Sequence, residues 1–562
     1  MRRLILRAIF FVPFAFSLCL HAQQPASGTT TPPDAAIAPT AAPAPVERSA
    51  PQQAAPLPPP TAANTITRNV SLVVLDGVAL DQKGNVVTDL KREDFHVTED
   101  DQPQNIRNFE IPGRFNPAPD VTIDSTADLD RLAPRAPVNI ILLDEFNTRF
   151  EDMAFARYSL KKWLEKQPDK LETPTMLIAV DLEHFAVLRD YTQSKDEILQ
   201  ALDHHFVANP WRNNSNSWAS ERYSTAFISL RRVAEAANGH FGHKNMIWIG
   251  RGFPTLNLIN VNMDAQTQIH NQVQLTVDEL RDARITLYTI DPAGLMVDPG
   301  VYGWDAQLYA PFGGEPTFEA LSRATGGRNI HGRNDVDAQI GSAIRDGSSL
   351  FTLTYTPTNP FGDREKFRRI KVTVDRPGIT FVTRQGYYPA IRPARLAPDG
   401  HAGGRLMTEL ASAASSNMDY DAVGFTVTSS PTDANEFRIR VESKGLAYYF
   451  TDGSKPRYTR VIVMATPFDK KNKVLKPDGR TYTFVAPITA SPTGHLNLPV
   501  AFVYKLPPDP KAVRVRFVVR VEASGHMGTA DIPLTPGATA SSSSAELTPP
   551  ATPKASPAPA SN

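Results

Sequence analysis

The residues of this chain that could do chemistry are oxygen-bearing side chains placed directly after apolar segments. Asp144 follows the apolar run 138–143, VNIILL, and Thr148 stands four positions further on. Asp291 follows a second apolar run, 285–290, ITLYTI. Carboxylate and hydroxyl oxygens are the ligands that Mg²⁺ and Mn²⁺ take in proteins. These residues are therefore candidate metal ligands or polar contacts, provided that the two runs are strands ending at the same edge of a sheet.

The elements that would position these residues form an alternating pattern. Continuous apolar runs are typical of strands buried on both faces of a parallel sheet. Between residues 134 and 347 such runs alternate with helical periodicity, at about 195–206, 225–237, 273–283, 318–324 and 336–344. The alternation predicts a doubly wound α/β domain over residues 134–347. Ligands of such sheets lie beyond the carboxyl ends of the strands, so Asp144, Asn147 and Asp291 are expected on one rim.

Strand-like segments with turn clusters lie on either side of the α/β domain, in residues 65–112 and 349–388. Neither stretch has enough strands to bury an apolar face alone. We expect the two stretches to form one β-sandwich, into which the α/β domain is inserted. Residues 405–535 predict a second, C-terminal β-sandwich. The expected fold class is therefore multidomain, α/β plus all-β.

The strand end LLDEFNT, 142–148, resembles the metal-ion-dependent adhesion site of von Willebrand factor type A domains. The family pattern D-x-S-x-S is matched at Asp144 and conservatively at Thr148, with Phe146 where a serine is expected. The family's threonine, at the start of the helix before the fourth strand, corresponds to Thr225. Its aspartate after that strand is replaced by Arg251. The resemblance implies a degenerate metal site formed by Asp144, Thr148 and Thr225.

Three further segments carry the same likeness: NMIWIGRGFP, ITLYTIDPAGL and FRRIKVTVDRPGITFVTRQGYY. With the opening stretch VTDLKREDFHVTEDDQPQNI, they make the chain similar to von Willebrand A-related proteins of the acidobacterial type over about residues 65–390. The likeness implies a von Willebrand A-like α/β domain, whereas the role of such proteins is mostly undefined.

The substitutions argue against a strong metal site. Phe146 supplies no oxygen, and Arg251 brings positive charge where a carboxylate would neutralise the ion. We expect Mg²⁺ or Mn²⁺ to bind weakly or not at all, and no other cofactor is predicted. The alternatives are that Asp144 pairs with Arg251, that it caps the next helix, or that the site takes another polar ligand.

Two aromatic residues of the sequence are candidates for binding. Two tryptophans, Trp211 and Trp218, stand in a polar loop and suit a recognition surface, although they could equally fold back as a loop core. Together with Asn147, Arg251 and Asp291 they form the expected binding face.

Catalytic patterns are weak in this sequence. The pair Asp181 and Glu183 could be a general acid and base, or a solvated strand end. His240 and His243 stand in a glycine-rich connection and are read as loop residues. No catalytic residue is predicted.

The ends of the chain indicate its destination. Residues 1–22, MRRLILRAIFFVPFAFSLCLHA, combine basic residues, a short apolar run and a small final residue, which predicts a secretory signal; the alternative is a membrane anchor. Residues 23–64 and 536–562 are rich in proline and alanine and predict a disordered linker and tail. The only cysteine, Cys19, lies in the signal. We expect a secreted or periplasmic protein with no membrane span in the mature chain.

The charge balance narrows the class of partner. The 59 basic residues equal the 59 acidic residues, which gives no indication of binding to nucleic acid or to an anionic membrane. The sequence predicts an exported interaction protein that binds a protein or polysaccharide of the cell envelope or exterior, with the β domains as spacers. The alternatives are an envelope hydrolase with an acidic or residual metal site, and a structural envelope subunit.

Overall fold

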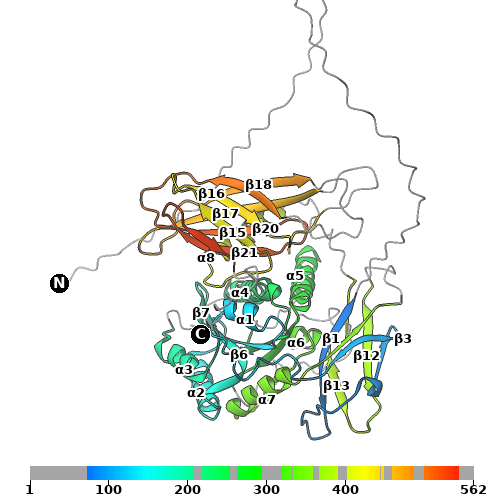
Figure 1. Cartoon of the computed structure of the whole chain (residues 1–562). Coiled ribbons are helices and arrows are strands. Elements are labelled where there is room, and N and C mark those ends of the chain that lie inside the picture. Colours follow the sequence, from blue (N-terminus) through cyan, green and yellow to red (C-terminus); the bar gives the residue numbers. More distant parts are fainter. Residues whose placement is uncertain are drawn as a thin grey trace, which may run out of the picture. The chain divides into compact units, whose positions relative to one another are not determined.

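The computed structural model describes residues 72–207, 217–252, 263–293, 318–330, 333–358, 366–389, 402–443, 445–448, 458–485 and 499–542 (Figure 1). The chain divides into a unit of residues 1–65 and a unit of residues 66–562, and every described residue belongs to the second. The expected signal peptide, the linker 23–64 and residues 543–562 of the expected tail lie outside the described residues. Among the helices that are described, none is long and apolar enough to cross a membrane.

The described residues form a multidomain α/β plus β protein, which confirms the predicted fold class at this level. The first β region contains strands from both stretches that flank the α/β domain. One sheet has the order β13-β1-β11-β4 and the other has the order β14-β12-β2-β3. Their bounds are β1 Val73–Leu80, β2 Phe95–Glu99, β3 Gln102–Gln104, β4 Ile106–Glu110, β11 Phe351–Tyr355, β12 Arg368–Val374, β13 Thr380–Thr383 and β14 Gly386–Tyr387, with a short 3-10 helix at Arg92–Asp94.

Aromatic residues from distant parts of the sequence fill the core of this region. The Phe95 ring lies 5.4 Å from Phe351 and 5.2 Å from Phe381, centroid to centroid. Strand β2 alternates between buried and exposed side chains, as expected for a strand with one face on a core. The two stretches thus share one core, because each supplies part of both sheets.

The α/β domain is built on a six-stranded sheet with the order β10-β9-β8-β5-β6-β7. All its neighbouring strands are parallel except the edge strand β7, which is antiparallel to β6. The strands are β5 Val138–Asp144, β6 Lys170–Val180, β7 Phe185–Ser194, β8 Lys244–Ile249, β9 Ile285–Ile290 and β10 Asn329–Ile330. The helices are α1 Thr126–Leu132, α2 Phe150–Glu165, α3 Lys195–His204, α4 Ser217–Ala236, α5 Met263–Asp282, α6 Phe318–Ala324 and α7 Val336–Ser348, with a 3-10 turn at Ala237–Gly239.

Helices cover both faces of this sheet. Ile140 and Leu142 of β5 belong to the core formed with α4, α5 and α6. Ile141 and Leu143 of the same strand belong to the core formed with α2, α3 and α7. Because alternate side chains of a strand point to opposite faces, a strand buried on both faces is apolar along most of its length. The run 138–143 is explained in this way, and its polar member, Asn139, is buried and accepts from Asn245 Nδ2 at 3.0 Å.

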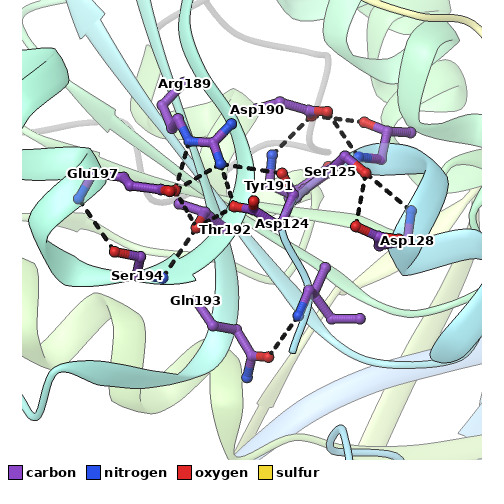
Figure 2. A network of polar contacts seen from close by, with 12 residues as sticks. Asp124, Ser125, Asp128, Arg189, Asp190, Tyr191, Thr192, Gln193, Ser194 and Glu197 are labelled. Carbon is purple, nitrogen blue, oxygen red and sulfur yellow. Dashed lines mark hydrogen bonds and ion pairs between the residues drawn. The ribbon is translucent and has the colours of Figure 1, made fainter. Parts of the chain in front are cut away.

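A polar network covers the outer edge of the sheet, where the segment before β5 meets β7 (Figure 2). Arg189 of β7 forms an ion pair with Asp124, and Asp190 accepts two hydrogen bonds from the first residue of α1 at 2.7 Å. The backbone of Gln193 donates to the carbonyl of Ile123 at 3.0 Å, and the Gln193 side chain accepts from the Ile123 amide at 3.1 Å. These contacts satisfy backbone groups that an uncovered edge strand would leave open to other chains.

Several boundaries differ from the sequence prediction. Helix α5 begins at Met263, ten residues before the start expected at about 273. Helix α4 begins at Ser217, so Thr225 lies inside the helix rather than opening it. The residues before Thr225 include Ala219, Glu221 and Arg222, which favour helix and extend it toward the N-terminus. Strand β22, Thr539–Ser541, lies in the expected disordered tail, where it pairs with β15 and so satisfies the backbone of an edge strand.

The C-terminal region consists of helix α8, Ala402–Ser415, and two four-stranded antiparallel sheets. The sheet orders are β19-β16-β15-β22 and β18-β17-β20-β21. The strands are β15 Phe425–Ser429, β16 Glu436–Val441, β17 Tyr458–Phe468, β18 Asp478–Val485, β19 Val500–Lys505, β20 Arg514–Val521 and β21 Met527–Pro533. The side chains that face one another between the sheets form a core of their own. The arrangement is that of a sandwich.

The C-terminal sandwich is packed against the α/β domain through α8. Leu410 of α8 and Met464 of β17 belong to the same apolar core as Leu230 of α4. Buried ion pairs accompany this core: Glu409 of α8 lies 3.1 Å from Arg231 of α4 and 3.1 Å from Arg520 of β20, and Arg231 also lies 2.7 Å from Glu279 of α5. The sandwich expected as a spacer therefore covers the α4 face of the α/β domain.

Candidate functional site

The candidate site lies where the strand connections of the α/β sheet change direction. Strands β5 and β8 are parallel neighbours in the middle of the sheet. After β5 the chain continues into α2 on one face, whereas after β8 it continues into α5 on the other face. In open α/β sheets, ligands commonly bind beyond the carboxyl ends of the strands at the position where the connections diverge in this way. Asp144 ends β5, and Gly250, Arg251 and Gly252 follow β8 directly.

The carboxyl group of Asp144 is fully buried and is held by donors of the protein. Its Oδ1 accepts from the Asn147 amide at 2.9 Å. Its Oδ2 accepts from the Gly252 amide at 2.8 Å and from the Trp248 indole Nε1 at 3.1 Å. Burial raises the pKa of Asp144 to about 7, although these donors and the positive charge of Arg222 act in the opposite direction. Both carboxyl oxygens are thus engaged within the fold.

Gly250 allows the backbone after β8 to approach Asp144 closely. Its φ is +147°, which side-chain-bearing residues rarely adopt. A Cβ at this position would overlap Asp144 Cβ and Thr148 Oγ1. The Thr148 hydroxyl oxygen accepts from the Arg251 amide at 3.2 Å. The backbone of the loop after β8 therefore packs against the side chains of the loop after β5, and the Thr148 hydroxyl joins the two loops.

Asn147 joins the same contact through its amide. Its Nδ2 donates to the carbonyl of Gly252, and its Oδ1 accepts from an Arg222 guanidinium nitrogen at 3.2 Å. Arg222 comes from α4 and was missed by the sequence reasoning, which named Thr225. A helix beginning at Ser217 carries residues 222 and 225 on neighbouring positions of one face, so the correct start of α4 would have indicated Arg222. Thr225 is half-buried and makes no hydrogen bond with Asp144, within the described residues.

Arg251 does not pair with Asp144, contrary to one of the alternatives. Its Nε lies 3.8 Å from Asp291 Oδ1, and one of its terminal nitrogens lies 3.9 Å from Asp152 Oδ2. The Arg251 side chain is 25% exposed. Burial raises the pKa of Asp152, and the charge of Arg251 opposes that shift. Asp291 also accepts from the Ala293 amide at 3.0 Å, so the carboxylate closes a turn after β9.

Phe146 occupies the inside of the loop. It is buried, and its ring meets Trp248 edge to face at a centroid distance of 6.1 Å. Trp248 in turn meets Phe318 of α6 at 5.0 Å. The residue that stands where the family pattern has a serine therefore belongs to the apolar core and directs no oxygen to Asp144.

The residues of this site do not fit a divalent ion. Each oxygen of Asp144 already accepts from the protein, Thr148 is engaged by the Arg251 amide, and Arg222 brings a positive charge. An ion would need several oxygens with free lone pairs around it. Among the described residues no group of three or more His, Cys, Asp or Glu side chains is arranged to hold a metal.

The remaining predicted residues are placed as follows. Trp211 lies outside the described residues; the backbone of Trp218 belongs to α4, and its side chain is not described. Asp181 Oδ1 accepts from the backbone amides of Glu183 and His184, at 2.7 Å and 2.6 Å. The Asp181 carboxylate thereby closes the turn between β6 and β7.

No protein-family model and no curated protein matches this chain. Solved structures that it resembles include the pilus adhesin SpaC from Lactobacillus rhamnosus GG, with 8% identity and a TM-score of 0.23 over 71% of this chain and 66% of the adhesin. The chain thus spans about two thirds of the adhesin's length. Another is the SpRpn10 VWA domain, with 15% identity and a TM-score of 0.16 over 30% of this chain and 91% of that domain. At such TM-scores neither likeness carries an argument about this chain.

Proposed function

We propose that this chain is an exported binding protein, and that the carboxyl-end face of its α/β sheet receives an acidic partner without a metal ion. The partner is a protein or polysaccharide of the cell envelope or exterior that carries carboxylate groups. The protein acts by binding and not by catalysis. Export is inferred from the N-terminal signal pattern alone.

The observation that carries the proposal is the position of Arg251. It stands directly after β8, between two glycines, and its side chain is 25% exposed. Its separations from Asp152 and Asp291, 3.9 Å and 3.8 Å, are ion-pair distances longer than a hydrogen bond. A partly exposed arginine side chain can form a bidentate hydrogen-bonded pair with a partner's carboxylate.

Two further features of the α/β domain support binding at the carboxyl ends of its strands. The α4 side of the α/β domain is covered by α8 and the C-terminal sandwich. The locked carboxyl of Asp144 gives the loop that carries Arg251 a firm base, since Gly252 donates to it directly. A rigid base lowers the entropy that binding must overcome.

The test is a binding measurement with the mature full-length chain. The probes are poly-glutamate and a uronic-acid polysaccharide, followed by envelope extract. We expect Arg251→Ala to reduce binding about tenfold or more, since one charged bidentate pair is lost. Arg131→Ala is the matched control, because Arg131 is an exposed arginine of α1 paired with Asp128. Chelation of divalent ions should leave binding unchanged.

Two outcomes would contradict the proposal. Equal binding by the wild type and Arg251→Ala would remove the arginine from the interface. Binding that chelation abolishes would point to a metal-dependent site. The hydrolase alternative gains no support from Asp181, whose carboxylate is engaged by the turn amides.

Export has its own test. The mature chain should begin within a few residues of Gln23, which mass spectrometry of the exported protein can measure. Recovery of the chain outside the cytoplasm with Met1 intact would contradict cleavage at this position.

A further inference from the structure

A polar cavity lies at the amino ends of the central strands of the α/β sheet. Its volume is about 50 Å³, and its lining includes Pro137, His243 and Arg284, which directly precede β5, β8 and β9. Glu110 and the loop after β4 complete it. A single water needs about 10–15 Å³ measured in this way, so the cavity has room for a few waters or one small polar group. We call it the amino-edge cavity, because it lies at the amino ends of these strands, whereas Asp144 lies at a carboxyl end.

The wall of the amino-edge cavity contains a buried histidine with an unused nitrogen. His243 is 7% exposed, and its Nδ1 lies 3.3 Å from Asp76 Oδ2. Asp76 is held as a carboxylate: burial would raise its pKa, but Arg284 and His243 outweigh burial and keep the pKa well below its ordinary value. Neither ring nitrogen of His243 has a hydrogen-bond partner within the described residues. Because Nδ1 faces the Asp76 carboxylate, Nε2 is left as the acceptor.

Arg284 lies beside His243 and Asp76, and its backbone adopts an unfavourable conformation. Its φ is +56°, in the left-handed region that non-glycine residues seldom occupy. The guanidinium donates to Asp76 at 2.7 Å and 3.1 Å and to the carbonyl of Phe241 at 3.0 Å. Backbone strain of this kind persists where the surrounding contacts over-determine it, and it is common at ligand sites.

A second buried acceptor and two exposed cations belong to the same cavity. Asn116 lines it, and Asn116 Oδ1 is buried with no hydrogen-bond partner in the part of the chain that is described. Arg114 and Arg135 line it as well and share the ring of Phe115, at 5.5 Å and 3.8 Å from its centroid. Stacking on one ring holds the two guanidiniums near each other.

The charges around the cavity leave an excess of positive charge. Arg135 pairs with Glu110 at 2.6 Å, and Arg284 pairs with Asp76. Arg114 forms no ion pair with any described residue. A ligand that suits this lining must accept from guanidinium donors and must also bring, or take up, a proton for the His243 acceptor.

We propose that the amino-edge cavity binds a small oxyanion, the size of a phosphate or carboxylate group, through Arg114 and Arg135, with His243 sharing a proton with the anion. A hydrogen phosphate brings its own O–H donor for Nε2. A carboxylate has no such proton, so its binding draws one from solvent onto Nε2. Arginine suits both anions, since its planar fork donates two parallel hydrogen bonds. The charged groups that act on His243 are Asp76 of β1, Arg284 before β9 and Lys244 of β8.

The experiment is calorimetry on the full mature chain with inorganic phosphate and, separately, acetate. We expect Arg114→Gln and Arg135→Gln each to weaken binding of the preferred anion about tenfold or more. Arg131→Gln, at an exposed arginine that does not line the cavity, should bind as the wild type does. Both exposed arginines can be replaced without opening the core, and thermal unfolding verifies that each variant is folded.

Proton uptake on binding distinguishes a phosphate ligand from a carboxylate ligand. Acetate binding should take up a proton, so its heat depends on the ionisation enthalpy of the buffer, and His243→Gln should abolish that dependence. Binding of hydrogen phosphate should show little proton uptake in either protein. No heat from either anion up to about 10 mM would mean that the cavity holds water only and would overturn the proposal. Binding that survives in both Arg114→Gln and Arg135→Gln would overturn it as well.

Discussion

The indole Nε1 of Trp248 donates a hydrogen bond to Asp144 Oδ2 at 3.1 Å, across the boundary between two neighbouring parallel strands. Trp248 belongs to β8 and is fully buried, as is Asp144 at the end of β5. The sequence predicted that the Asp144 carboxyl group would face a ligand. In the structure it joins the ends of β5 and β8 by a hydrogen bond.

The first prediction concerns pH. Burial raises the pKa of Asp144 to about 7 from an ordinary 3.8, so the folded chain holds a proton that the unfolded chain releases at lower pH. The free energy of unfolding should therefore fall as the pH rises from about 4 to about 7, by a few kcal/mol from this group. The asparagine of Asp144→Asn cannot titrate. The free energy of unfolding of the wild type, minus that of this variant, should therefore fall as the pH rises from about 4 to about 7.

Chemical denaturation at a series of pH values measures that difference. Asp120→Asn, at an exposed aspartate, controls for the removal of a surface carboxylate. Parallel pH profiles for the wild type and Asp144→Asn would show that Asp144 does not titrate in the folded chain as described.

The second prediction concerns the close approach at Gly250. A Cβ there would overlap Asp144 Cβ and Thr148 Oγ1, and the φ of +147° would strain any side-chain-bearing residue. Gly250→Ala should lower the free energy of unfolding by about 3 kcal/mol, measured by denaturant unfolding. Gly479→Ala in β18 is the control, because its added Cβ would meet only the Val463 carbonyl oxygen at 4.0 Å. A loss at Gly250 no larger than at Gly479 would contradict the packed strand-end contact.

The third prediction concerns metal ions. Calorimetry with Mg²⁺ and Mn²⁺ on the mature chain should detect no binding up to about 1 mM, since a site with one engaged carboxyl and a nearby guanidinium has little attraction for a cation. Asp144→Ala should leave this result unchanged. Micromolar binding that disappears in Asp144→Ala would show that the loops rearrange to release the carboxylate.

The fourth prediction concerns the interface made by α8. Glu409 is the shared partner of Arg231 and Arg520, and all three side chains are at least 87% buried, with exposures of 11%, 13% and 13%. Glu409→Ala leaves two buried guanidiniums short of a partner and should cost about 3 kcal/mol of unfolding free energy. Glu436→Ala removes a solvent-screened pair with Lys505 and should lower the free energy of unfolding much less. Equal losses in the two variants would mean that the C-terminal sandwich is not docked through this network.

Local patterns were enough for much of the fold. The apolar runs 138–143 and 285–290 are strands β5 and β9, and the periodicity over 318–324 and 336–344 marks α6 and α7. In such patterns the spacing of apolar residues along the chain shows which side chains face the core and which face solvent. Helix α8, AGGRLMTELASAAS, was missed although its apolar residues recur at helical spacing, at Leu406, Leu410, Ala413 and Ala414.

The contacts within the candidate site could not be predicted from local patterns. The sequence placed Asp144, Asn147 and Thr148 on one loop and Arg251 on another, and the structure brings these loops together at the centre of the sheet. Spacing could not reveal that Asp144 would bond to Trp248, 104 residues away, or that Arg251 would turn to Asp152 and Asp291. The partner of a buried polar group depends on strand order and on the packing of distant helices. A pattern of residue types along the chain records only that such a group must find a partner, since leaving it unpaired in the core costs free energy.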